Sequence, residues 1–175
     1  MIIGTGDIGT AIKESGIDRN DVIFFCSGVS NSKETDKKQF QREYRLLLEQ
    51  DRDLHLVYFS TLSVYYGGSD YVNHKKNMEM CIKKMFNKYT IVRIGNITWG
   101  DNPNTIINHF RNKVKNGEYI SIDSIDDYRF LVDKKEFIHW LKLIPVGAKN
   151  EMNITGKMVS VPDLAQQIHV EAYKN

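Results

Sequence analysis

The sequence predicts an α/β fold, a Rossmann-like three-layer parallel sheet that is shortened and carries a small C-terminal region. Two observations predict it. Apolar runs such as VIFFC at 22–26 and TIVRI at 90–94 are continuous, as in strands that are buried on both faces of a sheet. Segments with helical spacing separate these runs, and strands that alternate with helices favour a parallel sheet covered on both faces.

The expected elements alternate along the whole chain. A short apolar segment at 2–3 leads into glycines. Further strands are expected at 22–26, 54–59, 90–94, 119–122 and 152–154. Helices are expected at 8–15, 36–50, 71–87, 105–116, 134–144 and 161–172. Apolar stripes at helical spacing support the two longest helices: Phe40, Tyr44, Leu47 and Leu48 in the first, and Met78, Cys81, Ile82 and Met85 in the second.

Length and composition indicate one compact unit. With 175 residues, we expect a nucleotide-binding core over 1–100 and a reduced substrate-side region over 101–175, packed on the same core. The net charge of +2 is too small to indicate nucleic acid or an anionic membrane as a partner. No apolar run approaches the roughly 20 residues that span a bilayer, and no secretory signal is visible.

Cysteines and histidines give no sign of a disulfide or a metal site. Cys26 and Cys81 are far apart and neither lies in a CxxC pair, which favours two reduced thiols in a cytoplasmic protein. The histidines are scattered, with no HExxH pattern, so we expect no metal.

The segment Gly4-Thr5-Gly6-Asp7-Ile8-Gly9 fits the pattern GxGxxG. It follows a strand and opens a helix, which is the context that this motif requires. Glycines there permit a tight turn, close approach of a pyrophosphate and close packing of helix against strand, while the helix N-terminus offers N–H groups to the anion. Asp7 places a carboxylate near the expected phosphate unless its side chain points outward or caps the helix. The alternative is a tight turn without a ligand.

The usual second strand of a dinucleotide-binding unit is absent. That strand normally ends in an Asp or Glu about 20 residues past the glycine loop, which holds the adenosine ribose. Here 10–20 holds only a short helix and a turn, and the next strand begins almost at once. We therefore expect the adenosine side of the sheet to be missing.

Tyr71 and Lys75 are four residues apart, which places both on one face of a helix. A nearby ammonium favours the phenolate, so Lys75 is expected to lower the pKa of Tyr71 and let it exchange a proton with a substrate hydroxyl. Thr61, or Ser60, follows the strand at 54–59 and can hydrogen-bond the same oxygen. His74 is expected to face elsewhere, because adjacent helix positions diverge. The alternative is an exposed tyrosine beside a solvated lysine.

These residues resemble the extended short-chain dehydrogenase/reductase family, the nucleotide-sugar epimerases and dehydratases. The similar segments occur in the family's order: 4–9, 21–30, 57–65, 71–79, 90–100, 129–133, 152–154 and 159–161. The resemblance implies a catalytic Thr61, Tyr71 and Lys75. It also implies cofactor contacts from Gly4, Gly6, Asp7, Ile8, Gly9, Ser27, Gly28, Ser60, Arg93 and Asn96.

The same resemblance implies NAD or NADP as cofactor, a sugar or nucleotide-sugar as substrate, and a homodimer through the helices at 36–50 and 71–87. Members of the family are much longer than this chain, and both the adenosine side and the sugar-binding region are reduced here.

Three functions remain open from the sequence. The first is an NAD(P)-dependent epimerase, dehydratase or reductase of surface-polysaccharide or sugar-nucleotide metabolism, in which the cofactor supplies the hydride chemistry. The second is a non-catalytic partner protein that binds a nucleotide or a sugar, which the missing strand favours. The third is an isomerase or lyase that uses the Tyr–Lys pair without a cofactor.

Overall fold

A parallel sheet forms the centre of the protein in the computed structural model, which describes residues 1–122 and 127–172. Within these residues the sheet has five strands in the order β1-β2-β3-β4-β7. Their bounds are β1 (Ile2–Ile3), β2 (Val22–Phe25), β3 (His55–Thr61), β4 (Tyr89–Ile94) and β7 (Lys149–Ile154). All neighbouring pairs are parallel, so the carboxyl ends of the strands meet at one edge.

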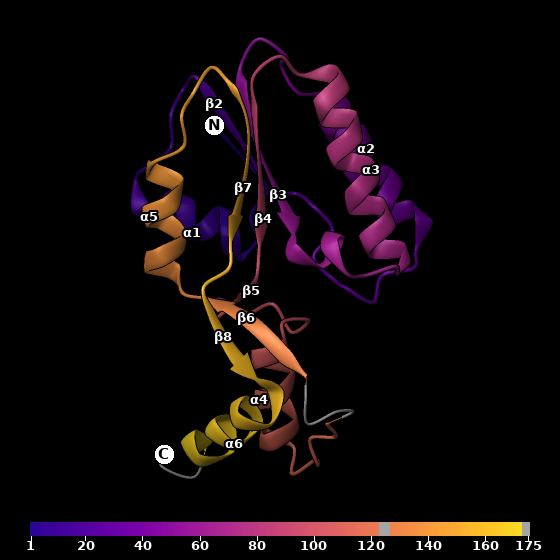
Figure 1. Cartoon of the computed structure of the whole chain (residues 1–175), viewed down its shortest axis with the longest axis vertical. Helices are drawn as coiled ribbons and strands as arrows, with labels where there is room; N and C mark the ends of the chain where they lie inside the picture. Colours follow the sequence, from indigo (N-terminus) through magenta and orange to yellow (C-terminus); the bar gives the residue numbers. More distant parts are fainter. Residues whose placement is uncertain (123–126, 173–175) are drawn as a thin grey trace.

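Two pairs of helices cover the two faces of this sheet (Figure 1). One pair is α1 (Asp7–Ser15) and α5 (Lys134–Lys142), and the other is α2 (Lys37–Leu48) and α3 (Asp70–Met85). Successive strand residues alternate between the two faces, as in any pleated strand. Phe24 thus packs in the cluster beneath α1 and α5, while Ile23 and Phe25 pack beneath α2 and α3.

Side-chain caps fix where the covering helices begin. Asp36 accepts a hydrogen bond from the Lys38 amide at the start of α2, and Ser69 accepts one from the Val72 amide at the start of α3. Asp133 does the same for α5. Each cap satisfies an N–H group that a helix leaves free in its first turn, so the positions of α2 and α3 relative to the strand ends are set locally.

A second, smaller sheet lies below the carboxyl edge of the main one in Figure 1. It contains β5 (Asn96–Ile97), β6 (Tyr128–Val132) and β8 (Lys157–Ser160), with β6 parallel to β5 and antiparallel to β8. The helices α4 (Ile106–Lys115) and α6 (Val161–Ala172) pack together beside it around Phe110, Leu164 and Ile168.

The chain leaves the main sheet after β4, builds β5, α4 and β6, and then returns through α5 and β7. The last strand of the main sheet is therefore drawn from residues beyond 100, where β7 pairs with β4 along Tyr89–Ile94. After β7 the chain crosses back into the smaller sheet as β8.

The parallel α/β architecture predicted from the sequence is confirmed, and so is its shortening. β2 follows α1 directly and pairs with β1, and no strand of the described residues lies on the other side of β1. The strand expected at 119–122 is wrong: Ile120 and Ile122 pack without a strand partner against the cluster between α4 and α6. The short helix η1 (Leu62–Tyr65) and the strands β5, β6 and β8 were not expected.

The apolar stripe expected on α2 is partly wrong. Tyr44 and Leu48 are 39% and 42% exposed, whereas Glu43 is fully buried at 0%. The face that packs is therefore rotated toward Phe40, Glu43 and Leu47. Within the described ranges, no helix combines the length and the apolar character needed to cross a membrane.

Candidate active site

A cavity of about 590 Å³ lies at the carboxyl edge of the main sheet, facing the smaller sheet. The glycine loop, the turn after β2, the end of β3 and the first turns of α3 form its walls, and β5 and the loop at 102–105 complete them. Most of the residues predicted for the site line this cavity: Gly4, Gly6, Asp7, Ile8, Ser27, Gly28, Ser60, Thr61, Tyr71, Lys75 and Asn96. Gly9 and Arg93 do not.

The glycine loop has the backbone that its pattern predicts. Gly4 has φ of 112°, which disfavours any residue with a side chain. A Cβ at Gly9 would lie 2.6 Å from the Gly4 carbonyl oxygen, so this glycine permits the close packing of α1 on β1. A Cβ at Gly6 would meet no atom within 4 Å. The backbone at the start of α1 is therefore open to the cavity, where a helix N-terminus favours an anion.

The Asp7 side chain is held by the loop after β5. Its two carboxylate oxygens accept hydrogen bonds from the amides of Asp101, at 3.2 Å, and Asn102, at 3.1 Å. The Asn102 side chain in turn donates to the hydroxyl of Ser30 at 3.1 Å. The carboxylate thus holds the loop after β5 against the glycine loop instead of capping its own helix.

Thr61, Tyr71 and Lys75 meet at one wall of the cavity. Thr61 is the last residue of β3, where its hydroxyl caps η1 by accepting from the Ser63 amide at 3.2 Å. Tyr71 and Lys75 lie one helical turn apart on α3 and face the same way, with the Lys75 ammonium 5.8 Å from the centre of the Tyr71 ring. The structure therefore brings together the three residues that the sequence singled out.

The ammonium of Lys75 is held by a group that the sequence did not reveal. Lys75 Nζ donates to Glu43 Oε1 at 3.0 Å and to the hydroxyl of Tyr58 at 3.2 Å. His74 Nε2 lies 2.9 Å from Glu43 Oε2. The expectation that His74 faces elsewhere is therefore wrong: adjacent positions on α3 reach the same carboxylate from two sides.

Burial and neighbouring groups together shift the pKa values of Tyr71 and Glu43. Removal from water raises the pKa of Tyr71; the Lys75 charge and the Thr61 hydroxyl oppose this rise, and the Glu43 charge adds to it. The net direction is opposite to the lowered pKa expected from the spacing of Tyr71 and Lys75. Burial alone would raise the pKa of Glu43, but Lys75 and hydrogen bonds from His74, Tyr58 and Val29 outweigh it and lower that pKa to about 2.

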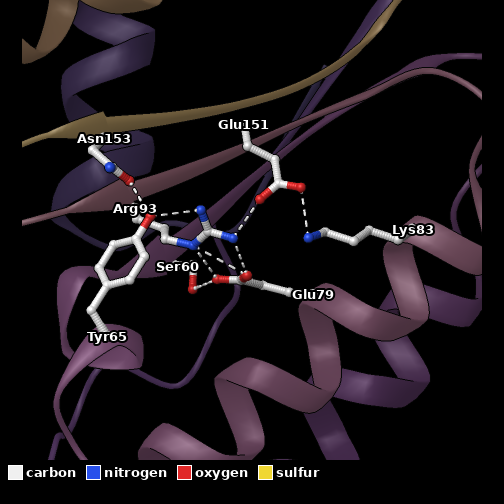
Figure 2. Close-up of polar contacts among 7 residues, drawn as sticks. All are labelled: Ser60, Tyr65, Glu79, Lys83, Arg93, Glu151 and Asn153. Atoms are coloured by element: carbon white, nitrogen blue, oxygen red, sulfur yellow. Dashed lines mark hydrogen bonds and ion pairs between the residues drawn. The ribbon is translucent and has the colours of Figure 1, made fainter.

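Arg93 lies behind the cavity in a polar network that Figure 2 shows. Its guanidinium donates to both oxygens of Glu79 and to Glu151 at 2.6 Å. The hydrogen bond with Glu79, opposed by burial, raises the pKa of Arg93 above its usual value. Tyr65 receives a further hydrogen bond from Arg93 at 2.9 Å. Arg93 thus ties β4 to α3, β7 and η1.

Ser60 and Asn96 connect this framework to the cavity. The Ser60 hydroxyl donates to Glu79 Oε1 at 2.6 Å, next to Arg93. The Asn96 side chain donates to the Phe130 carbonyl at 3.3 Å and so joins β5 to β6. Both residues line the cavity while their side chains are engaged with the protein.

Among the cavity residues that were not predicted for the site, Cys26 carries a thiol and Arg42 a charge. The Cys26 thiol follows β2, and burial raises its pKa to about 12, which leaves it a thiol rather than a nucleophile. Arg42 donates to the Ser27 carbonyl at 3.0 Å and brings a positive charge to the rim. Its spacing from Phe40 and Glu43 on α2 gave no signal of this. Among residues 1–122 and 127–172, no group of His, Cys, Asp or Glu side chains could hold a metal ion.

Comparison with known proteins identifies the fold. No family model matches the chain, and no curated protein matches it. Among solved structures, it resembles a UDP-N-acetylglucosamine 4-epimerase from Methanobrevibacter ruminantium in complex with UDP-N-acetylmuramic acid. The identity is 17% and the TM-score 0.68, over 89% of this chain and 61% of the other.

Two further structures resemble it to the same degree. One is a UDP-glucuronic acid 4-epimerase from Bacillus cereus with UDP-glucuronic acid and NAD bound: 17% identity, TM-score 0.68, 97% of this chain and 63% of the other. The second is a double mutant of a dTDP-glucose 4,6-dehydratase from Streptomyces venezuelae, with NAD and DAU bound. Its identity is 15% and its TM-score 0.66, over 95% of this chain and 61% of the other.

The protein therefore has the Rossmann-like fold of NAD-dependent nucleotide-sugar epimerases and dehydratases, the kind of enzyme that the sequence resemblance implied. It spans 61% to 63% of the length of these three structures.

Proposed function

We propose that this protein is an NAD(P)-dependent enzyme of the epimerase, dehydratase or reductase kind, acting on a sugar or nucleotide-sugar of surface-polysaccharide or sugar-nucleotide metabolism. One observation carries the proposal: Thr61, Tyr71 and Lys75 line the same cavity as the open backbone at Gly6. A proton-transfer group and an anion site thus face one space, as a reaction between a substrate and a phosphate-bearing cofactor requires.

The residues of the cavity fit the phosphate part of such a cofactor. Gly6 is open to the cavity, and the first turn of α1 points its N–H groups there. Arg42 adds a positive charge at the rim. When bound, the nicotinamide would supply the hydride exchange. NAD and NADP are both compatible, because the described residues contain no strand beyond β1 whose acidic residue would select between them.

The protein's own residues would move the proton. Tyr71 lies at the cavity wall and would give its phenolic proton to a substrate oxygen or accept one from a hydroxyl. Thr61 would hydrogen-bond the same oxygen and orient it. Lys75 would bring a positive charge near the Tyr71 ring and stabilise the phenolate that forms.

Binding and turnover test the proposal separately. The nicotinamide fluorescence of NADH or NADPH should change when the cofactor binds to the protein. The variant Gly6→Asp, which fills the opening with a carboxylate, should abolish that binding. Turnover of a nucleotide-sugar should be lost in Tyr71→Phe while folding survives. Absence of binding of either cofactor at millimolar concentrations, or full activity of Tyr71→Phe, would contradict the proposal.

A non-catalytic binding protein is the second candidate, and one observation favours it. β1 has two residues and pairs only with β2 in the described part of the chain, so nothing flanks the adenosine side of the cavity. Such a protein would bind a UDP-sugar or dTDP-sugar without turnover, and calorimetry with these ligands distinguishes it from an enzyme.

A further inference from the structure

The Glu43 carboxylate is the most completely enclosed charged group among the described residues, at 0% exposure, and the proposed function does not use it. Both of its oxygens are fully engaged. Oε1 accepts from Lys75 at 3.0 Å and from the Tyr58 hydroxyl at 2.7 Å. Oε2 accepts from the Val29 amide at 2.7 Å and contacts His74 at 2.9 Å.

These contacts join α2, α3, β3 and the turn after β2 at the cavity wall that contains Tyr71. Glu43 belongs to α2, Lys75 and His74 to α3, Tyr58 to β3, and Val29 to the turn after β2. The turn is built to admit the ammonium, since a Cβ at Gly28 would lie 2.7 Å from Lys75 Nζ and 3.1 Å from Glu43 Oε1. A side chain at Gly28 would therefore displace the ion pair.

We propose that Glu43 is a positioning residue for the proton-transfer pair: it fixes the Lys75 ammonium behind Tyr71 and neutralises its charge, so that Tyr71 rests as a phenol. This inference rests on the proposed function and deepens it. A resting phenol is ready to donate, and its proton passes from Tyr71 Oη to an acceptor oxygen. The substrate class that this favours is a sugar carrying a carbonyl group, whose oxygen takes up the proton while the nicotinamide of the proposed function would supply the hydride to the carbonyl carbon.

The charges that act on Tyr71 are those of Lys75 and Glu43. Lys75 alone would pull the phenol toward its ionised form, because an opposite charge nearby stabilises a phenolate. Glu43 supplies an equal negative charge at 3.0 Å from that ammonium. The other titratable neighbours are His74, which is bonded to Glu43, and Tyr58, whose pKa is raised by burial and by Glu43 and, more weakly, by Tyr71 and Glu79.

The experiment is a titration of Tyr71 itself. Protein labelled with ¹³C at tyrosine Cζ is titrated by NMR from neutral to alkaline pH, with Tyr71→Phe assigning the signal. In Glu43→Gln, the uncompensated Lys75 charge should lower the Tyr71 midpoint by about one pH unit or more. Glu49→Gln makes the same chemical change at an exposed position of the segment after α2 and should leave the midpoint unchanged.

A double variant keeps the test decisive if Glu43→Gln does not fold. Glu43→Gln/Lys75→Met removes both charges. Replacing both members of a buried ion pair destabilises a protein less than removing one member, which leaves an unpaired charge buried. Its Tyr71 midpoint should stay within about half a pH unit of the wild type, because the two opposing effects on Tyr71 are removed together.

Two results would overturn the inference: a folded Glu43→Gln protein with an unchanged Tyr71 midpoint, or a double variant that differs from the wild type by more than about one pH unit. The titration needs neither cofactor nor sugar. A failure here therefore leaves the proposed function standing, and an inactive protein with the expected midpoints would contradict the proposed function alone.

Discussion

Asp7 Oδ2 accepts a hydrogen bond from the Asn102 amide at 3.1 Å, which joins the glycine loop to a loop 95 residues later in the chain. The sequence placed this carboxylate where it would repel a phosphate. In the structure it instead holds one wall of the cavity against the other, and backbone amides of the loop after β5 hydrogen-bond to its negative charge.

Replacing Asp7 should loosen that wall. Asp7→Ala removes the acceptor for two amides, those of Asp101 and Asn102, and should cost about 1 kcal/mol of the free energy of unfolding in urea. Hydrogen exchange of these two amides should accelerate. Asp7→Asn keeps one oxygen acceptor, so its free energy of unfolding and its exchange rates should lie between those of the wild type and Asp7→Ala. Unchanged exchange in Asp7→Ala would show that the loop is held by other contacts.

Arg93 should be important for stability rather than for binding. Arg93→Met leaves Glu79 buried without its cation and should lower the free energy of unfolding by about 3 kcal/mol. Lys83→Met is the matched control. Its ammonium pairs with Glu151 where both side chains are 38% exposed, and its loss should cost less than about 1 kcal/mol. Equal losses in chemical denaturation would contradict this assignment.

His55 should make stability depend on pH. Its Nδ1 accepts from the Gly147 amide at 3.1 Å, so Nε2 carries the proton and donates to Thr90 Oγ1 at 2.9 Å. Burial lowers the pKa of His55 below its ordinary value of about 6.5, so the unfolded chain takes up a proton first as the pH falls. The stability that His55 contributes is therefore complete above about pH 6.5 and is lost below it.

The measurement compares urea unfolding of the wild type and His55→Asn from pH 8 to pH 5. The difference between them should shrink toward acid by at most about 1.4 kcal/mol per pH unit. A constant difference for His55→Asn would disprove the linkage.

The outer surfaces of α2 and α3 should form the homodimer that the sequence resemblance implies. Tyr44 and Leu48 on α2 and Met80 on α3 are exposed apolar side chains, although both helices bury their other face on the sheet. Light scattering should find a dimer for the wild type and a monomer for Leu48→Glu. Leu143→Glu introduces the same charge at a similarly exposed leucine beyond α5 and should remain dimeric.

The sequence predicted what depends on local pattern. Continuous apolar runs located β2, β3 and β4, and the spacing of Tyr71 and Lys75 placed them together, because helix geometry determines which residues share a face. The smaller sheet was missed because β6 and β8 contain polar residues such as Arg129 and Lys157 and are separated in the chain by α5 and β7. Periodicity cannot reveal a partner that distant.

Glu43 was missed for a different reason. A glutamate beside Arg42 on a helix has the pattern of a solvated surface residue, and only tertiary packing turns it toward Lys75 and His74. The pKa of Tyr71 could not be predicted for the same reason, since its direction depends on burial and on Glu43. A carboxylate at the same spacing as Phe40 and Leu47 was the one signal available.

The path of the chain between the two sheets has a mechanical consequence. It passes between them after β4, after β6 and after β7, and neighbouring passes are bonded to one another. The Gly95 amide, which follows β4, donates to the carbonyl of Ile154 at the end of β7 at 3.0 Å, and within the smaller sheet Asn96 donates to the Phe130 carbonyl at 3.3 Å. A hinge needs a few free links that absorb rotation, and these passes offer none without breaking such bonds. We therefore expect the cavity to keep its width, so that selection among ligands depends on fit to a preformed shape rather than on closure around them.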